Sequence, residues 1–269
     1  MTSTHASFSG SIPEYYDHCL GPAWFDPFAA DLAARLPRRP PGDVVEIACG
    51  TGLVTRQLRE RLDPSVRIVA TDLSKAMLDY ARDKSALSNV EWCDADAMQL
   101  PFADGQFAAA VCGFGLMFMP DKHAALAQAR RVLGAGGTLL LNTWDGIEAN
   151  RHAAACAEVV ESLFPGDPEM RFTTPYELRD PELIRDLLAQ ARFEDVRIDK
   201  TCLPLGRVSA RSIALGQIRG TPRSLLFEKR GVSLDDMVDK VAAALTRVGG
   251  ADPYVGTAQA VVVEARRGA

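Results

Sequence analysis

The sequence has no paired cysteines, no metal-binding cluster and no apolar run long enough to cross a membrane. Its six cysteines are scattered without a CxxC pair, which argues against a disulfide framework or a zinc knuckle. The longest apolar run, 107–119, is too short to span a bilayer, and the N-terminal residues lack the pattern of a secretory signal. We therefore expect free thiols, no bound metal and a cytoplasmic location.

The sequence also lacks a dense cluster of basic residues. It has 35 acidic and 30 basic residues and a formal net charge of -5, and its one basic pair, Arg38-Arg39, lies between prolines. Because proteins that bind phosphate backbones carry clustered Lys and Arg, we expect a small-molecule substrate rather than nucleic acid. Nothing in the sequence indicates an oligomeric state.

What the sequence does contain is an alternation of short apolar segments and amphipathic segments. This order predicts a mostly parallel sheet covered by helices on both faces. The expected strands are 44–48, 66–71, 89–93, 107–112, 137–143, 194–202 and 257–265. The expected helices are 52–62, 75–86, 122–133, 150–163, 180–191 and 233–248.

Capping residues define several of these helix ends. Asp26 followed by Pro27 is expected to cap and begin a helix that contains Phe28 and Leu32. Gly134 is expected to end helix 122–133, and Ser233 is a good N-cap for the helix that follows it.

The strongest functional signal is the segment from Glu46 to Gly52, EIACGTG, between an expected strand and an expected helix. Glycines there let the backbone approach a ligand closely. Such a turn binds either the pyrophosphate of a dinucleotide or the methionyl and ribose part of S-adenosylmethionine, and it also occurs as a purely structural turn.

Asp72 follows the second expected strand, about 20 residues after the glycine turn. At that distance an acidic side chain accepts hydrogen bonds from ribose hydroxyls. The alternative is that Asp72 only caps the helix that begins near Ser74.

Four motifs in this order resemble the class I S-adenosylmethionine-dependent methyltransferases, in particular the ubiquinone and menaquinone biosynthesis branch. The resemblance covers roughly residues 40–145 and implies a Rossmann-like, doubly wound α/β fold with a mostly parallel, seven-stranded sheet and an inserted, mainly helical cap. The motifs are Glu46 to Gly52, Thr71 to Ser74 with Met77, Asp96-Ala97 through Leu100-Pro101-Phe102, and Arg131-Val132-Leu133 before Gly136-Gly137.

The resemblance implies S-adenosylmethionine as the cofactor and assigns residues to each part of it. Residues around the methionyl moiety would be Glu46, Ala48, Gly50 and Gly52; the ribose would be held by Asp72, and the adenine by Leu73, Met77, Asp96 and Ala97. The family usually has glycine at the position of Ala48. Asp96 also fits a simple turn after the third strand.

The resemblance further implies that the end of the fourth strand lines the space beside the reactive methyl group. Candidate pocket residues are Cys112, Gly113, Phe114 and Met117, with Trp144 after the fifth strand; core packing explains them equally well.

The aromatic residues before the fold proper are expected to close over cofactor and substrate. Tyr16 is assigned to the cofactor side and Tyr15 to the substrate pocket, although a helix packed on the core also explains them. His123 is the one histidine expected near a substrate as a proton acceptor, and a surface position in a helix is the alternative.

Three parts of the chain are expected: a helical lid segment (1–40), a cofactor-binding core (41–145), and cap insertions with the last two strands of the same sheet (146–269). The predicted function is transfer of a methyl group to an oxygen, nitrogen or carbon nucleophile of a small apolar or aromatic molecule. Two alternatives remain open: an NAD(P)-dependent oxidoreductase, which leaves the third motif and the Gly136-Gly137 turn without a role, and a non-catalytic nucleoside-binding protein.

Overall fold

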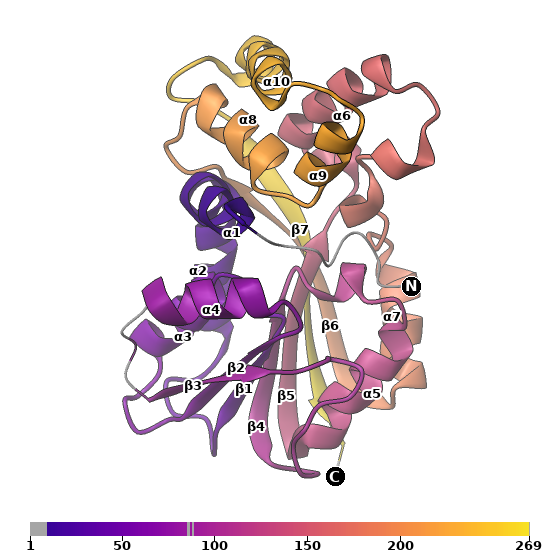
Figure 1. Cartoon of the computed structure of the whole chain (residues 1–269). Coiled ribbons are helices and arrows are strands. Elements are labelled where there is room, and N and C mark those ends of the chain that lie inside the picture. Colours follow the sequence, from indigo (N-terminus) through magenta and orange to yellow (C-terminus); the bar gives the residue numbers. More distant parts are fainter. Residues whose placement is uncertain (1–9, 85–86, 88, 269) are drawn as a thin grey trace.

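The computed structural model describes residues 10–84, 87 and 89–268 and contains a seven-stranded sheet (Figure 1). The strand order is β3-β2-β1-β4-β5-β7-β6, in which β7 runs antiparallel to both of its neighbours. This arrangement confirms the predicted Rossmann-like fold. The strands are β1 Val44–Ile47, β2 Ile68–Asp72, β3 Val90–Asp94, β4 Phe107–Gly113, β5 Leu133–Trp144, β6 Phe193–Pro204 and β7 Thr257–Arg267.

Helices cover both faces of the sheet because each buries one apolar stripe. On one side lie α2 Asp26–Arg35, α3 Leu53–Arg61 and α4 Lys75–Lys84, and on the other lie α5 Lys122–Val132 and α7 Pro181–Gln190 (Figure 1). In α5 the buried residues Ala125, Leu126, Ala129 and Val132 recur at helical spacing. The last two residues of the expected helix 75–86 lie outside the described residues.

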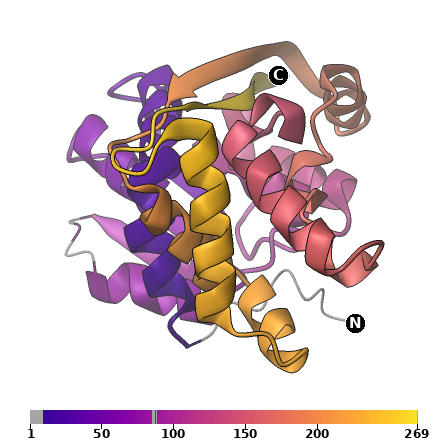
Figure 2. The ribbon, with the colours of Figure 1, turned by 90° about the horizontal axis from the view of Figure 1, so that it is seen from above.

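A second group of helices forms a cap beyond the carboxyl ends of the parallel strands. It contains α6 Arg151–Leu163, α8 Ala210–Arg219, α9 Arg223–Lys229 and α10 Leu234–Gly249. Helix α10 packs against α6 and α8, and Figure 2 shows it in gold across the top of the molecule. Three short 3₁₀ helices lie between β5 and α7. The first, η4 Ile147–Ala149, precedes α6, and the other two, η5 Pro168–Met170 and η6 Thr174–Tyr176, follow it. No helix in the described part of the chain is long and apolar enough to span a bilayer.

The N-terminal segment is one continuous helical rod that contacts both the sheet layer and the cap. It begins with α1 Ile12–Tyr15, continues as a ten-residue π-helix, η2 Tyr16–Phe25, and passes directly into α2. The expectation that Asp26 caps the start of a helix is wrong, because Phe25 and Asp26 both already have right-handed helical backbone angles. Asp26 instead accepts a hydrogen bond from Arg56 at 2.7 Å.

Two other helix assignments also needed correction. Gly134 does not cap α5, because Leu133 is already extended and begins β5, where it pairs with Phe107. Helix 180–191 was grouped with the cap, but α7 packs on α5 and β6 and belongs to the layer that covers the sheet.

Candidate functional site

The turn between β1 and α3 lies at the carboxyl edge of the sheet and has an unusual backbone. Ala48, Gly50 and Gly52 all have positive φ, at 58°, 56° and 79°. A side chain on Gly52 would lie 3.1 Å from the Trp92 ring, whereas one on Gly50 would meet no atom within 4 Å. The turn therefore needs glycine at position 52 for close packing and presents an open backbone surface at Gly50.

Ala48 is accommodated by a second glycine in the neighbouring turn. A β-carbon added to Gly115 would lie 2.6 Å from the Ala48 methyl group. The methyl group thus occupies the space that a side chain at position 115 would need. Because positive φ disfavours non-glycine residues, Ala48 keeps a strained backbone at the point where the family usually has glycine.

Glu46 is a buried carboxylate without a full set of partners. Glu46 is 1% exposed, and its Oε2 atom has no hydrogen-bond partner. Burial raises the pKa of Glu46 to about 8, and the charge of Asp72 adds to this while Thr55 opposes it. The hydroxyl groups of Thr51 and Thr55 are also buried and unpaired. Buried polar groups whose hydrogen bonding is incomplete call for an explanation, and a bound polar ligand is one.

The Asp72 carboxylate is fixed by two hydrogen bonds within the protein, and its role toward a ribose stays a prediction. Its two carboxylate oxygens accept hydrogen bonds from the backbone amides of Ser74, at 2.7 Å, and Gly50, at 2.8 Å. It therefore fixes the glycine turn and the residue before α4, while the Ser74 hydroxyl accepts a hydrogen bond from the Met77 amide in the first turn of that helix. Burial raises the pKa of Asp72, and the backbone hydrogen bonds oppose this shift. A carboxylate has further lone pairs with which to accept ligand hydroxyls.

The N-terminal segment brings Tyr16 close to this carboxylate. Burial, followed by the charge of Asp72, raises the pKa of the Tyr16 phenol. The Tyr16 ring stacks on Phe25 at a centroid distance of 4.9 Å. Tyr15 points elsewhere, because the Arg219 guanidinium of α8 lies 5.9 Å from its ring. Of the two tyrosines, Tyr16 is the one beside the expected ribose position.

The residues assigned to the adenine lie along β2, α4 and the turn after β3. Leu73 is 57% exposed although it is a large apolar side chain, whereas Met77 of α4 is buried. Asp96 forms a turn in which its carboxylate accepts a hydrogen bond from the Met98 amide at 2.8 Å. Ala97 is the central residue of that turn and is half-buried. Their roles toward adenine stay predictions.

The candidate pocket residues at the ends of β4 and β5 join an aromatic cluster. Phe114, with a φ of 55°, stacks on Trp144 at 3.9 Å, and both are buried. Met117 is buried in the short 3₁₀ helix η3 Leu116–Phe118, and Cys112 is buried in β4. Around Trp144 lie further rings of the cluster: Trp24, Phe25, Phe28 and Tyr176.

His123 and Gly113 occupy different surroundings. The His123 side chain is exposed in the first turn of α5, so its role as a proton acceptor stays a prediction. Gly113 faces Val54, which lies 2.8 Å from the position of an added β-carbon. Gly113 therefore permits close packing of α3 on the sheet.

Sequence reasoning missed two buried polar residues near the aromatic cluster. Asn142 of β5 accepts a hydrogen bond from the Phe114 amide through Oδ1, while its Nδ2 has no partner. His152 of α6 stacks on Trp24 at 4.6 Å, and neither of its ring nitrogens has a hydrogen-bond partner. No sequence pattern marks either residue, because both acquire these contacts only through the tertiary fold.

The core of the chain matches a known family. Residues 44–137 match the family model described as a methyltransferase domain. A demethylmenaquinone methyltransferase of Deinococcus radiodurans is 38% identical over 120 residues, which is 44% of this chain and 48% of that relative. The match therefore spans about half the length of the curated relative. The family model ends at residue 137, before the helices of the cap.

Solved structures share the fold of this chain. Phosphoethanolamine N-methyltransferase 2 of Haemonchus contortus, in complex with S-adenosyl-L-methionine, matches with a TM-score of 0.60 and 16% identity, covering 100% of this chain and 61% of that one. The [4+2]-cyclase SpnF matches with a TM-score of 0.57 and 20% identity, and the match covers 91% of this chain and 81% of that one. The oxidoreductase alternative gains no support from these matches.

Proposed function

We propose that this protein is an S-adenosylmethionine-dependent methyltransferase that acts on a small apolar or aromatic molecule. The observation that carries the proposal is the turn between β1 and α3, in which the open backbone at Gly50 donates its amide to Asp72 and the preceding strand contributes the buried carboxyl group of Glu46. The methyltransferase domain match over 44–137 includes this whole turn.

The residues of this turn fit the proposed cofactor. The Oε2 atom of Glu46 is buried without a hydrogen-bond partner, so a polar, partly cationic ligand portion would relieve its desolvation. Asp72 would hold the ribose hydroxyls, and the exposed Leu73 would cover one side of the adenine. When bound, S-adenosylmethionine supplies a methyl group attached to a cationic sulfur.

The protein's own contribution would be to orient two molecules and exclude water. The aromatic cluster offers flat apolar surfaces at the carboxyl ends of β4 and β5, and the N-terminal rod covers them from one side. Fixing two reactants in a reactive geometry contributes up to about 7–11 kcal/mol to catalysis. This role requires no covalent intermediate, and oxygen, nitrogen and carbon nucleophiles all remain compatible with it.

The class of acceptor is part of the same proposal. The relative from Deinococcus radiodurans is named for demethylmenaquinone, which favours a reduced quinone or a similar hydroxylated ring. The net charge of -5 disfavours a nucleic acid acceptor. All six cysteines are free, which supports a reducing location such as the cytoplasm.

The proposal is tested by incubating the full chain with methyl-labelled S-adenosylmethionine and a panel of hydroquinones, phenols and aromatic amines. We expect formation of S-adenosylhomocysteine together with a labelled acceptor, detected by mass spectrometry. Binding of S-adenosylmethionine without transfer to any acceptor would contradict the proposed activity. That result would be compatible with a different reaction on the same fold, as in the cyclase.

A further inference from the structure

His152 is a deeply buried imidazole near the Thr257 backbone, and its ring nitrogens make no hydrogen bond of ordinary geometry. It is 1% exposed, and both Nδ1 and Nε2 lack a partner. Such a group costs free energy in the protein alone, because desolvation of its polar atoms is not compensated. Unpaired buried polar groups in native proteins therefore call for an explanation.

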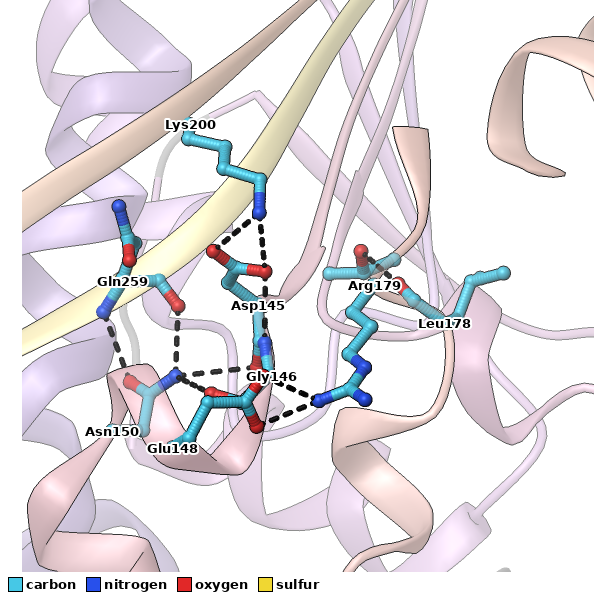
Figure 3. A network of polar contacts seen from close by, with 9 residues as sticks. Asp145, Gly146, Glu148, Asn150, Leu178, Arg179, Lys200 and Gln259 are labelled. Atoms are coloured by element: carbon cyan, nitrogen blue, oxygen red, sulfur yellow. Dashed lines mark hydrogen bonds and ion pairs between the residues drawn. The ribbon is translucent and has the colours of Figure 1, made fainter. Parts of the chain in front are cut away.

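The position of His152 is fixed by the polar network at the start of α6 (Figure 3). Asn150 is fully buried; its Nδ2 donates to the carbonyl oxygens of Asp145, Gly146 and Gln259, and its Oδ1 accepts from the Gln259 amide at 2.9 Å. Lys200 in turn binds the Asp145 carboxylate at 3.0 Å. This network ties the first turn of α6 to β7, so the imidazole two residues further on is held by its helix.

The surroundings of His152 are aromatic. Its ring stacks on Trp24 at 4.6 Å with an interplanar angle of 26°, and Trp24 meets Trp144 edge-on at 6.4 Å. Trp144 stacks in turn on Phe114, at the end of β4. His152 thus joins the aromatic cluster from the cap side, while Phe114 joins it from the side of the methyltransferase domain.

The imidazole is neutral in this environment. Burial lowers the pKa of His152 to about 4, and the backbone of Thr257 opposes the shift only in part. The positive end of the α6 dipole also disfavours a cation in the first turn. Among residues 10–84, 87 and 89–268, no carboxylate lies within 4.0 Å of His152. A neutral imidazole offers one donor and one acceptor.

We propose that His152 is a substrate-binding residue that hydrogen bonds to a hydroxyl group on a flat, uncharged ring lodged against Trp24 and Trp144. This inference rests on the proposed function and extends it by naming the side chain that recognises the acceptor. The aromatic cluster binds the faces of such a ring, and the imidazole selects for its hydroxyl group. A charged acceptor is disfavoured because no ion partner faces the imidazole.

The test compares phenol with toluene, which have nearly the same shape but differ in the hydroxyl group. Each is titrated in a sealed calorimeter into the full chain, the variants His152→Phe and His152→Gln, and the control Glu158→Gln, which changes an exposed side chain of the same helix. We expect the wild type to prefer phenol. The ratio of the two dissociation constants should fall by about tenfold in His152→Phe, because one buried hydrogen bond is lost. It should fall less in His152→Gln and remain unchanged in the control.

Two results would overturn the inference. One is wild-type protein that binds toluene at least as tightly as phenol, or binds neither; this outcome does not depend on whether any variant folds. The other is an unchanged ratio in His152→Phe. Titration of the same samples with S-adenosylhomocysteine tests the proposed function separately, and His152→Phe should leave that affinity unchanged.

Discussion

At the scale of single residues, the Glu46 carboxyl group destabilises the ligand-free protein when it is ionised. The carboxyl group is buried at the glycine turn with an unpaired oxygen, and this environment raises its pKa from 4.5 to about 8. The folded state therefore binds the proton of Glu46 more tightly than the unfolded state does. Ionisation of this group destabilises the ligand-free fold as the pH rises through that window.

We predict that Glu46→Gln removes this part of the pH dependence of stability. As the pH rises from about 4.5 to about 8, ionisation of Glu46 should lower the free energy of unfolding of the wild type. The variant lacks this group and should not show that decrease. The variant should thus equal the wild type near the lower limit and exceed it near the upper one. Urea unfolding at several pH values measures this difference.

The control for this measurement is Glu60→Gln, which changes an exposed glutamate in α3. The control should follow the wild type at every pH. The account of Glu46 fails if Glu46→Gln is less stable than the wild type near the upper limit. We also expect Glu46→Gln to bind S-adenosylhomocysteine more weakly, because its neutral amide no longer compensates a cationic amino group.

Several individual residues were predictable from sequence because their chemistry is local. Gly50, Gly52 and Asp72 lie within one strand-turn-helix unit and its neighbour, where spacing alone places them together. The match between Ala48 and Gly115 was not predictable, because it depends on how two turns from different strands meet.

At the scale of elements, the N-terminal rod links the two halves of the molecule. It contacts α4, where the Lys84 ammonium pairs with Asp17, and it contacts α8 of the cap. Gly206, in the loop after β6, donates its amide to the Ala23 carbonyl at 2.8 Å. A β-carbon on Gly206 would lie only 1.8 Å from the Pro22 carbonyl oxygen, so the loop and the rod are in direct backbone contact.

We predict that Gly206→Ala displaces the N-terminal rod from the cap. The added methyl group would collide with backbone rather than with a flexible side chain, and overpacking of this kind costs about 1–3 kcal/mol. Urea unfolding should show this loss, and limited proteolysis should cleave the rod faster. Gly42→Ala is the matched control, because its β-carbon would meet the nearest atom, on Ala108, at an ordinary 3.4 Å. Equal stability and equal proteolysis of the two variants would show that this contact does not hold the rod.

The elements that sequence predicted best are those with strong local signals. All seven strands lie where the alternation placed them, and Ser233 caps α10 by accepting a hydrogen bond from the Asp236 amide. Helices α8 and α9 were not predicted, although Ser209 caps α8 by accepting a hydrogen bond from the Ser212 amide. The π-helix η2 was also missed, because its backbone is set by packing against α8 and α3 rather than by its own residues.

At the scale of the whole molecule, the fold alone does not decide the reaction. The same architecture, at similar TM-scores, includes an N-methyltransferase and a [4+2]-cyclase. The function must therefore be argued from the side chains at the carboxyl edge of the sheet. The glycine turn and its contact with Asp72 were predictable because these residues lie within one local part of the sequence, 44–97. The contact of His152 with the aromatic cluster was not, because that cluster is assembled from the N-terminal rod, β5 and α6.

The measurement that tests the central claim most directly is calorimetric titration of the full chain with S-adenosylhomocysteine and, separately, with NAD and NADP. We expect binding of S-adenosylhomocysteine alone. Asp72→Ala should weaken the binding of S-adenosylhomocysteine by about 10- to 100-fold, as expected for loss of hydrogen bonds to a charged group. Asp94→Ala removes an exposed carboxylate at the end of β3 and should leave this affinity unchanged. Binding of a nicotinamide nucleotide instead, or of none of the three, would contradict the account.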